Sequence, residues 1–155
     1  MIISTFKFNL DPVLEHRRII EDDRQRDLAK HLRQKMILMD QLRQMQDTIR
    51  TSKHDLAGSL VGRVDLTRVA DFARYSGQTT IRAQQLVQKL AQLEQQISAS
   101  RERLLAATRD RKAMELLRDR RHREWHADQV RRETAELDDL ALQRHLRHVA
   151  LEHAA

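Results

Sequence analysis

Residues that break helices are almost absent from this chain. Its 155 residues include three glycines and one proline. Pro12 stands near the start, and the glycines are confined to positions 58, 62 and 77. A sheet needs a turn every few residues, and turns are built mainly from Gly, Pro, Asn and Asp. The two long stretches without Gly or Pro, 13–57 and 78–155, therefore predict an all-α fold made of long helices.

The composition favours an elongated helical protein over a globular one. Aromatic residues make up 3% of the chain and charged residues 34%, which leaves little material for a globular core. The hydrophobic 40% is mostly Leu, Ala, Met and Ile, which form helices readily. We therefore expect an elongated two-helix antiparallel coiled coil that forms a single domain over residues 1–155.

Local signals place the ends of the helices. Asp11 can cap a helix that begins at Pro12, where the missing proline N–H costs nothing. Gly58 and Gly62 predict the turn, because each lowers helix stability by about 1 kcal/mol relative to Ala, and Asp65 can cap a short helix after it. The expected elements are a helix over 12–57, a turn and short helix over 58–80, and a helix over 81–150.

Apolar residues recur at heptad spacing in both long helices. One heptad position of the first helix holds Leu14, Leu28, Leu42, Ile49 and Leu56. The partner position is expected to hold Leu32, Met39 and Leu60. The second helix carries apolar residues at the a and d positions of a heptad repeat: Leu86, Leu90, Leu93, Ile97 and Leu104. Polar residues such as Glu21 and Lys35 interrupt the first series, so the pattern predicts a coiled coil with polar layers.

The apolar series of the second helix fades after Met114. Arg111, Arg118 and Arg121 occupy positions where apolar residues would continue it. Because the second helix is the longer one, its residues after about 125 should lack an intramolecular partner. Trp125 either closes the coiled coil against the start of the first helix or anchors a partner protein, and we favour closure because an exposed Trp is costly.

The sequence contains no pattern that supports catalysis. It has no glycine-rich phosphate loop, no nucleophile elbow and no His-Glu-x-x-His run. Without cysteine it has no thiolate ligands for a metal. His122 and His126 have a spacing that can bind a metal, but the arginines around them disfavour a cation. We therefore expect no enzyme activity, no metal and no cofactor.

The charge of the chain indicates anionic partners. The formal net charge is +6, and arginines are concentrated between residues 101 and 132. Acidic protein surfaces, nucleic acids and lipid headgroups all fit a basic surface, but the 23 interspersed acidic residues weaken the last two. No apolar run approaches the roughly 20 residues that a membrane-spanning helix requires. The stretch 109–123 is either a solvated helix face joined by ion pairs or a surface that binds a partner.

Three segments, in order along the chain, form a distinctive set. Residues 6–17 read FKFNLDPVLEHR, residues 111–121 read RKAMELLRDRR, and residues 137–141 read LDDLA with Arg144 after them. They are similar to the patterns F-x-F-x-L-x-x-V-L-x-x-R, R-K-x-x-E-x-L-[KR]-[DE]-[KR] and L-D-[DE]-x-A. With these motifs the chain resembles the FliJ-like flagellar export family, which has relatives among the coiled-coil stalk proteins of injectisomes.

The resemblance implies a non-enzymatic component of the bacterial flagellar type III protein export apparatus. Such proteins are cytoplasmic and peripheral at the inner face of the cell membrane, and they resemble the stalk subunit of rotary ATPases. On this basis the expected partners are the hexameric export ATPase, the export gate membrane protein and the export chaperones.

The resemblance also suggests which residues bind these partners. Phe72 and Tyr75 are expected to contribute to docking on the export gate, although they could instead plug the end of the coiled coil. Four arginines are expected to contact acidic loops of the ATPase ring, because packing between the helices does not explain them: Arg111, Arg118, Arg120 and Arg121.

Two other functions fit the same composition. The high arginine content would suit a basic coiled coil that binds nucleic acid, but aromatic residues that stack on bases are missing and acidic residues interrupt the basic runs. The heptads would also suit a generic scaffold that dimerises through its apolar stripe.

Overall fold

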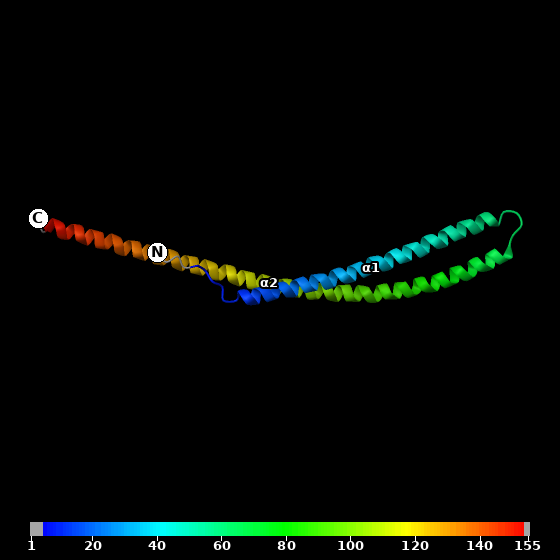
Figure 1. Ribbon diagram of the computed structural model, residues 1–155, viewed down its shortest axis with the longest axis horizontal. Helices are drawn as coiled ribbons and strands as arrows, with labels where there is room; N and C mark the ends of the chain where they lie inside the picture. The colour runs from blue at the N-terminus through cyan, green and yellow to red at the C-terminus, as the bar shows by residue number, and fades with distance from the viewer. Residues whose placement is uncertain (1–4, 154–155) are drawn as a thin grey trace. The chain divides into compact units, whose positions relative to one another are not determined.

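Two long helices make up nearly all of the chain. The computed structural model describes residues 5–153, and their side chains as far as residue 147. Helix α1 spans Asp11–Ser59 and helix α2 spans Leu66–His153, with the connection 60–65 between them (Figure 1). No strand is present between residues 5 and 153. The predicted all-α fold, two long helices packed against each other as a coiled-coil hairpin, is confirmed.

Helix α1 begins where the sequence predicts, and the cap that the sequence predicts at Asp65 is present at the start of α2. Asp11 lies in the first turn of α1, followed directly by Pro12, and the Asp11 backbone N–H donates to the carbonyl of Phe8 at 3.1 Å. At the start of α2, the Asp65 carboxylate accepts a hydrogen bond from the backbone N–H of Thr67 at 3.0 Å. This side chain satisfies an N–H group that the helix itself leaves without a partner.

The predicted boundary at residue 81 is wrong. The segment expected to form a separate short helix belongs to α2, which runs without interruption through Gly77. Phe72 and Thr79, on either side of this glycine, are both turned away from solvent, so packing holds the segment in register with the rest of the helix. The turn is consequently shorter than expected, and it contains Gly62 with a φ of 102°.

The chain divides into two compact units, of which one comprises Ile20–Thr108. In this unit the two helices lie side by side and antiparallel (Figure 1). The α2 side chains that are shielded from solvent recur at alternating spacings of four and three: Phe72, Ser76, Thr79, Ala83, Leu86, Leu90, Leu93, Ile97, Ser100, Leu104 and Ala107. Ile97 is 1% exposed, and this row forms the α2 side of the seam.

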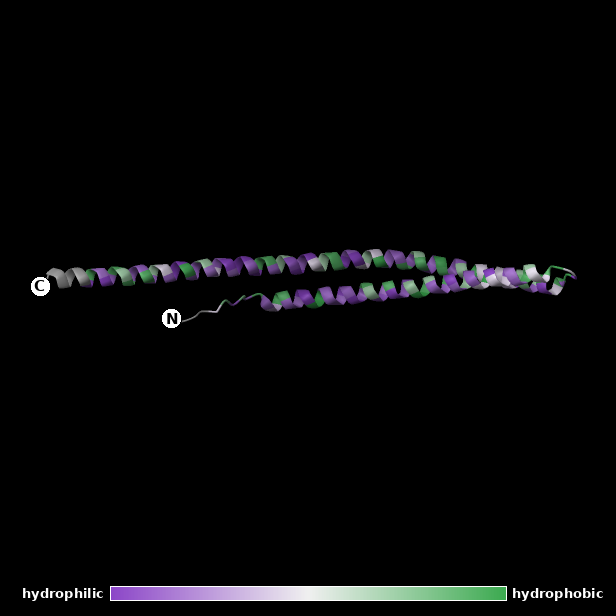
Figure 2. Cartoon of the chain, turned by 90° about the horizontal axis from the view of Figure 1, so that it is seen from above, coloured by the Kyte–Doolittle hydropathy of each residue, from purple (hydrophilic) through white to green (hydrophobic). Residues whose placement is uncertain are grey.

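The α1 side of the seam differs from the sequence prediction at one of its two heptad positions. Leu28, Leu42, Ile49 and Leu56 face α2 as expected. The partner position holds Arg24, His31, Leu38, Met45 and Ser52, each one residue before the position predicted from Leu32, Met39 and Leu60. Both positions carry a mixture of polar and apolar residues, so the hydrophobic pattern alone could not distinguish them. Polar and apolar residues alternate in short blocks along both helices (Figure 2).

Polar side chains from both helices meet within this seam. The Thr108 hydroxyl donates to the Glu21 carboxylate at 2.7 Å, and Lys35 forms an ion pair with Glu94. Lys35 lies two heptads after Glu21 on α1, and Glu94 lies two heptads before Thr108 on α2, so one antiparallel register satisfies both contacts. The prediction of polar layers is confirmed.

The second unit combines the chain as far as Ile19 with the residues from Arg109 onward. Its core contains Leu14, 2% exposed, and Phe8, which precedes α1. Every side chain described from Val130 to Arg147 is exposed. The expectation that α2 continues past its last intramolecular contacts is therefore confirmed for these residues.

Alanine substitutions at two glycines should change stability in opposite directions. Gly77→Ala places a methyl group where no atom lies within 4 Å, inside a helix, and should raise the free energy of unfolding by about 1 kcal/mol. Gly62→Ala forces a side chain onto a backbone with a φ of 102° and should lower that free energy by roughly 1–2 kcal/mol. Thermal unfolding followed by circular dichroism measures both. A lower midpoint for Gly77→Ala would contradict a continuous α2.

Candidate functional site

The four arginines singled out in the sequence have different environments in α2. Arg111 lies on the seam and donates to the Glu115 carboxylate at 2.6 Å, so the assumption that intramolecular packing does not explain it is wrong. Arg118 is half-buried and lines a hollow of about 320 Å³ with Phe6, Phe8 and His122 among its walls. The remaining two arginines, Arg120 and Arg121, are exposed.

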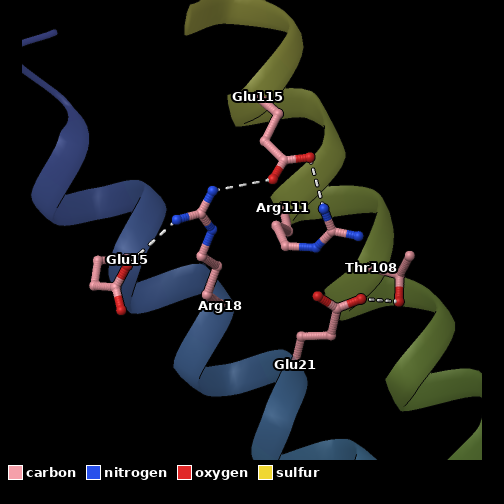
Figure 3. Close-up of polar contacts among 6 residues, drawn as sticks. All are labelled: Glu15, Arg18, Glu21, Thr108, Arg111 and Glu115. Atoms are coloured by element: carbon pink, nitrogen blue, oxygen red, sulfur yellow. Dashed lines mark hydrogen bonds and ion pairs between the residues drawn. The ribbon is translucent and has the colours of Figure 1, made fainter.

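Glu115 connects α1 and α2 in this unit. It accepts hydrogen bonds from Arg111, four residues earlier on α2, and from Arg18 of α1 at 3.4 Å (Figure 3). Arg18 also pairs with Glu15 at 3.6 Å. Sequence reasoning missed this cluster because the Arg18–Glu115 contact depends on the register between helices that are far apart in the sequence. The Arg111–Glu115 spacing of four was visible, but many such pairs exist on helices of this composition.

The two arginines change the acidity of Glu115. Partial burial acts to raise the pKa of this carboxyl, but the hydrogen bonds and positive charges of Arg111 and Arg18 outweigh it and hold the pKa below its usual value. Glu115 therefore stays ionised to lower pH when folded than when unfolded. Since its charge is balanced by two arginines, the cluster holds the seam together rather than offering a catalytic carboxylate.

Aromatic rings join the segment before α1 to the middle of α2. The Phe6 ring meets His122 edge-on with centroids 5.0 Å apart, and Trp125 lies 5.9 Å from Phe6. Trp125 is half-buried against Phe6, so the prediction that it packs within the chain holds, but its expected contact with the start of the first helix is wrong, because Phe6 precedes α1. The F-x-F motif at residues 6–8 therefore serves packing, because Phe6 contacts rings of α2 and Phe8 is buried.

The two aromatic residues predicted near the turn also differ in exposure. Phe72 is half-buried on the seam, as the plug interpretation requires. Tyr75 is 42% exposed and lines two neighbouring grooves, of about 490 and 360 Å³. The first groove also contains Gln44, Arg82 and Lys89, so its walls combine polar groups with the tyrosine ring. Tyr75 is therefore the better placed of the two to contact a partner.

Comparison with known proteins identifies the family. The family described as flagellar FliJ protein matches residues 6–150, which include both helices and the turn. The chain belongs to the FliJ family. No curated protein and no solved structure gives a significant match.

Membership of the FliJ family makes the chain a component of flagellar type III protein export. The match includes all three segments that suggested the resemblance, and the structure places them in distinct environments. The first packs against α2, the second contains the Glu115 cluster, and the third, residues 137–141, is exposed. Among the residues that the structure describes, no helix combines the length and the hydropathy needed to span a membrane.

The FliJ-family chain should lose stability when the Glu115 carboxylate is removed, in a pH-dependent way. Glu115→Gln should lower the free energy of unfolding by about 1 kcal/mol near neutral pH, because the cluster is partly exposed. A carboxyl whose pKa falls on folding stabilises the fold above its unfolded pKa, about 4.3, and that contribution disappears as the pH falls through the folded value. The difference in unfolding midpoint between variant and parent should therefore shrink as the pH is lowered below about 4.3.

The exposed Glu136 supplies the control, since Glu136→Gln should leave the midpoint unchanged at neutral and at acidic pH. A Glu115→Gln difference that is equally large at acidic and neutral pH would show that the charge of Glu115 is not what stabilises the cluster.

Proposed function

We propose that this chain is the non-enzymatic coiled-coil stalk of the flagellar export ATPase. The proposal places it in the cytoplasm, peripheral at the inner face of the cell membrane. The observation that carries it is the FliJ family match over residues 6–150 of a two-helix hairpin. The exposed residues 130–147 of α2 support it, because a stalk needs helix that is free to enter a ring.

The arginine-rich part of α2 is the proposed contact with the ATPase ring. Arg120 and Arg121 are exposed, with Arg121 paired to Glu124 on its own helix, and Arg118 borders an open hollow, so these three can reach acidic loops of another protein. Arg111 has a structural role in this proposal, because it pairs with Glu115 and so holds the part of α2 that carries the other three arginines. Charged contacts at the rim of an interface act mainly on association rate and salt dependence.

Reversing the charge of the three accessible arginines should separate ring binding from folding. The combined variant Arg118→Glu, Arg120→Glu and Arg121→Glu should bind the purified export ATPase at least tenfold more weakly at low salt and stimulate ATP hydrolysis less. Circular dichroism should stay helical. The matched control reverses three exposed arginines toward the other end of the hairpin: Arg50, Arg63 and Arg74. Equal loss in both variants would mean that net charge, rather than this surface, governs binding.

The grooves beside Tyr75 are the proposed docking site for the export gate. Tyr75→Ala should weaken binding to the purified cytoplasmic part of the gate about tenfold without shifting the unfolding midpoint, because the ring is substantially exposed. Phe72→Ala should instead lower the midpoint, because its side chain is half-buried on the seam. Gate binding that survives Tyr75→Ala would place the contact elsewhere.

Export chaperones are the third class of proposed partner. Their binding is supported by the family resemblance and by the amount of exposed apolar side chain on both helices, including Met36, Met39 and Val87. Monomeric soluble proteins seldom expose contiguous apolar patches that have no partner.

A further inference from the structure

Helix α1 carries a second apolar stripe that does not face α2. Leu32, Met36 and Met39 follow one another at spacings of four and three, as residues on one helix face do. Met36 is 67% exposed and Met39 is also exposed. The seam positions in this segment are occupied by other residues, His31, Lys35 and Leu38. Packing within the hairpin therefore does not account for the stripe.

An ion pair shows which part of α2 borders this stripe. Lys35 pairs with Glu94, and on α1 it lies three residues after Leu32 and four before Met39. On α2, residues seven and three positions before Glu94 share its face. They are Val87, which is 55% exposed, and Ala91. Small and medium apolar side chains from both helices thus border one flank of the hairpin.

This flank has the geometry that accepts a third helix. When a helix in a coiled coil bears apolar residues on a second heptad stripe beside its seam, another helix can pack along that stripe. Leu32, Met36 and Met39, at i, i+4 and i+7, correspond to two turns of such a contact, with Leu32 half-buried and the two methionines exposed. Met side chains are flexible and polarisable, so they adapt to the surface of an incoming helix.

The charges around the stripe indicate the chemistry of that helix. Arg33 lies three residues before Met36, and Arg43 lies seven after it, on the same face. Arg101, seven residues after Glu94, extends the positive charge on α2. All three are exposed, and none forms an ion pair within residues 5–147, whereas the acids on this face of α1 near the stripe are Asp40 and Asp47. A partner with acidic residues beside its apolar stripe is favoured.

We infer that the flank formed by Leu32, Met36, Met39, Val87 and Ala91 is a docking surface for one acidic amphipathic helix of a partner protein. None of these residues is Tyr75 or one of the arginines proposed to contact the ring. The inference rests on the proposed function in that the partner belongs to the export apparatus.

The test measures binding of the full chain to a panel of purified proteins from the same bacterium. The panel contains the export ATPase, the cytoplasmic part of the export gate and each export chaperone. Met36→Glu with Met39→Glu should weaken one of these complexes at least tenfold, while Met36→Leu with Met39→Leu restores it. Leu66→Glu, at another exposed apolar site on α2, is the matched control and should leave that complex intact. Glu is a good helix former, so the exposed positions should keep their helicity.

A photoreactive amino acid at position 36 then identifies the contact. The cross-link should fall on a helical segment of the affected partner that is rich in Asp and Glu. If panel proteins bind and none is weakened by the double Glu variant, the docking surface is wrong and the stalk proposal stands. If no panel protein binds the parent chain, the stalk proposal and the docking surface both fail. A cross-link to a second copy of the chain, or to a basic segment, would also overturn the inference.

Discussion

Burial of one stripe from each helix against the other is the interaction on which the rest of the structure depends. Isolated helices are marginally stable in water, and most helical stability in proteins comes from packing an amphipathic face. The faces here are narrow, and few side chains are buried as completely as Leu14 and Ile97. Polar contacts across the seam therefore matter beyond their individual strength. The Glu21–Thr108 and Lys35–Glu94 contacts form together in only one register of α1 against α2. They therefore specify the alignment of the two helices more strictly than leucine packing alone would.

The sequence was sufficient where a local signal has a single meaning. Asp11 and Pro12 mark the start of α1 because an acidic side chain in the first turn and a proline with a fixed φ both favour that place. Asp65 caps α2 for the same kind of reason. The boundary predicted at residue 81 is wrong because Gly77 weakens the helix without ending it, and the buried side chain of Thr79 packs the segment against the rest of the fold.

Features that depend on contact between the two helices could not be predicted. The α1 sequence does not decide whether the heptad position of Leu38 or that of Met39 faces the seam, because each position holds both polar and apolar residues. The choice depends on how the residues at each position pack against α2. Arg111 was predicted to be accessible to a partner because an arginine at a heptad position that is normally apolar indicates that packing between the helices has ended. Its true environment follows from Glu115, which also receives Arg18 from the other helix. An arginine on a heptad position can therefore be either a surface group or part of an internal cluster, and only the partner helix distinguishes these cases.

The exposed end of α2 has a consequence for how the protein recognises anything that contacts it. Residues 130–147 are helical, yet all their side chains remain in water. Their backbone hydrogen bonds have no tertiary packing to protect them, so amide protons there should exchange with solvent far faster than those around Ile97. A partner that binds this segment must hold its backbone hydrogen bonds closed. Part of the interaction energy is then used for ordering, which favours complexes that are specific but readily released.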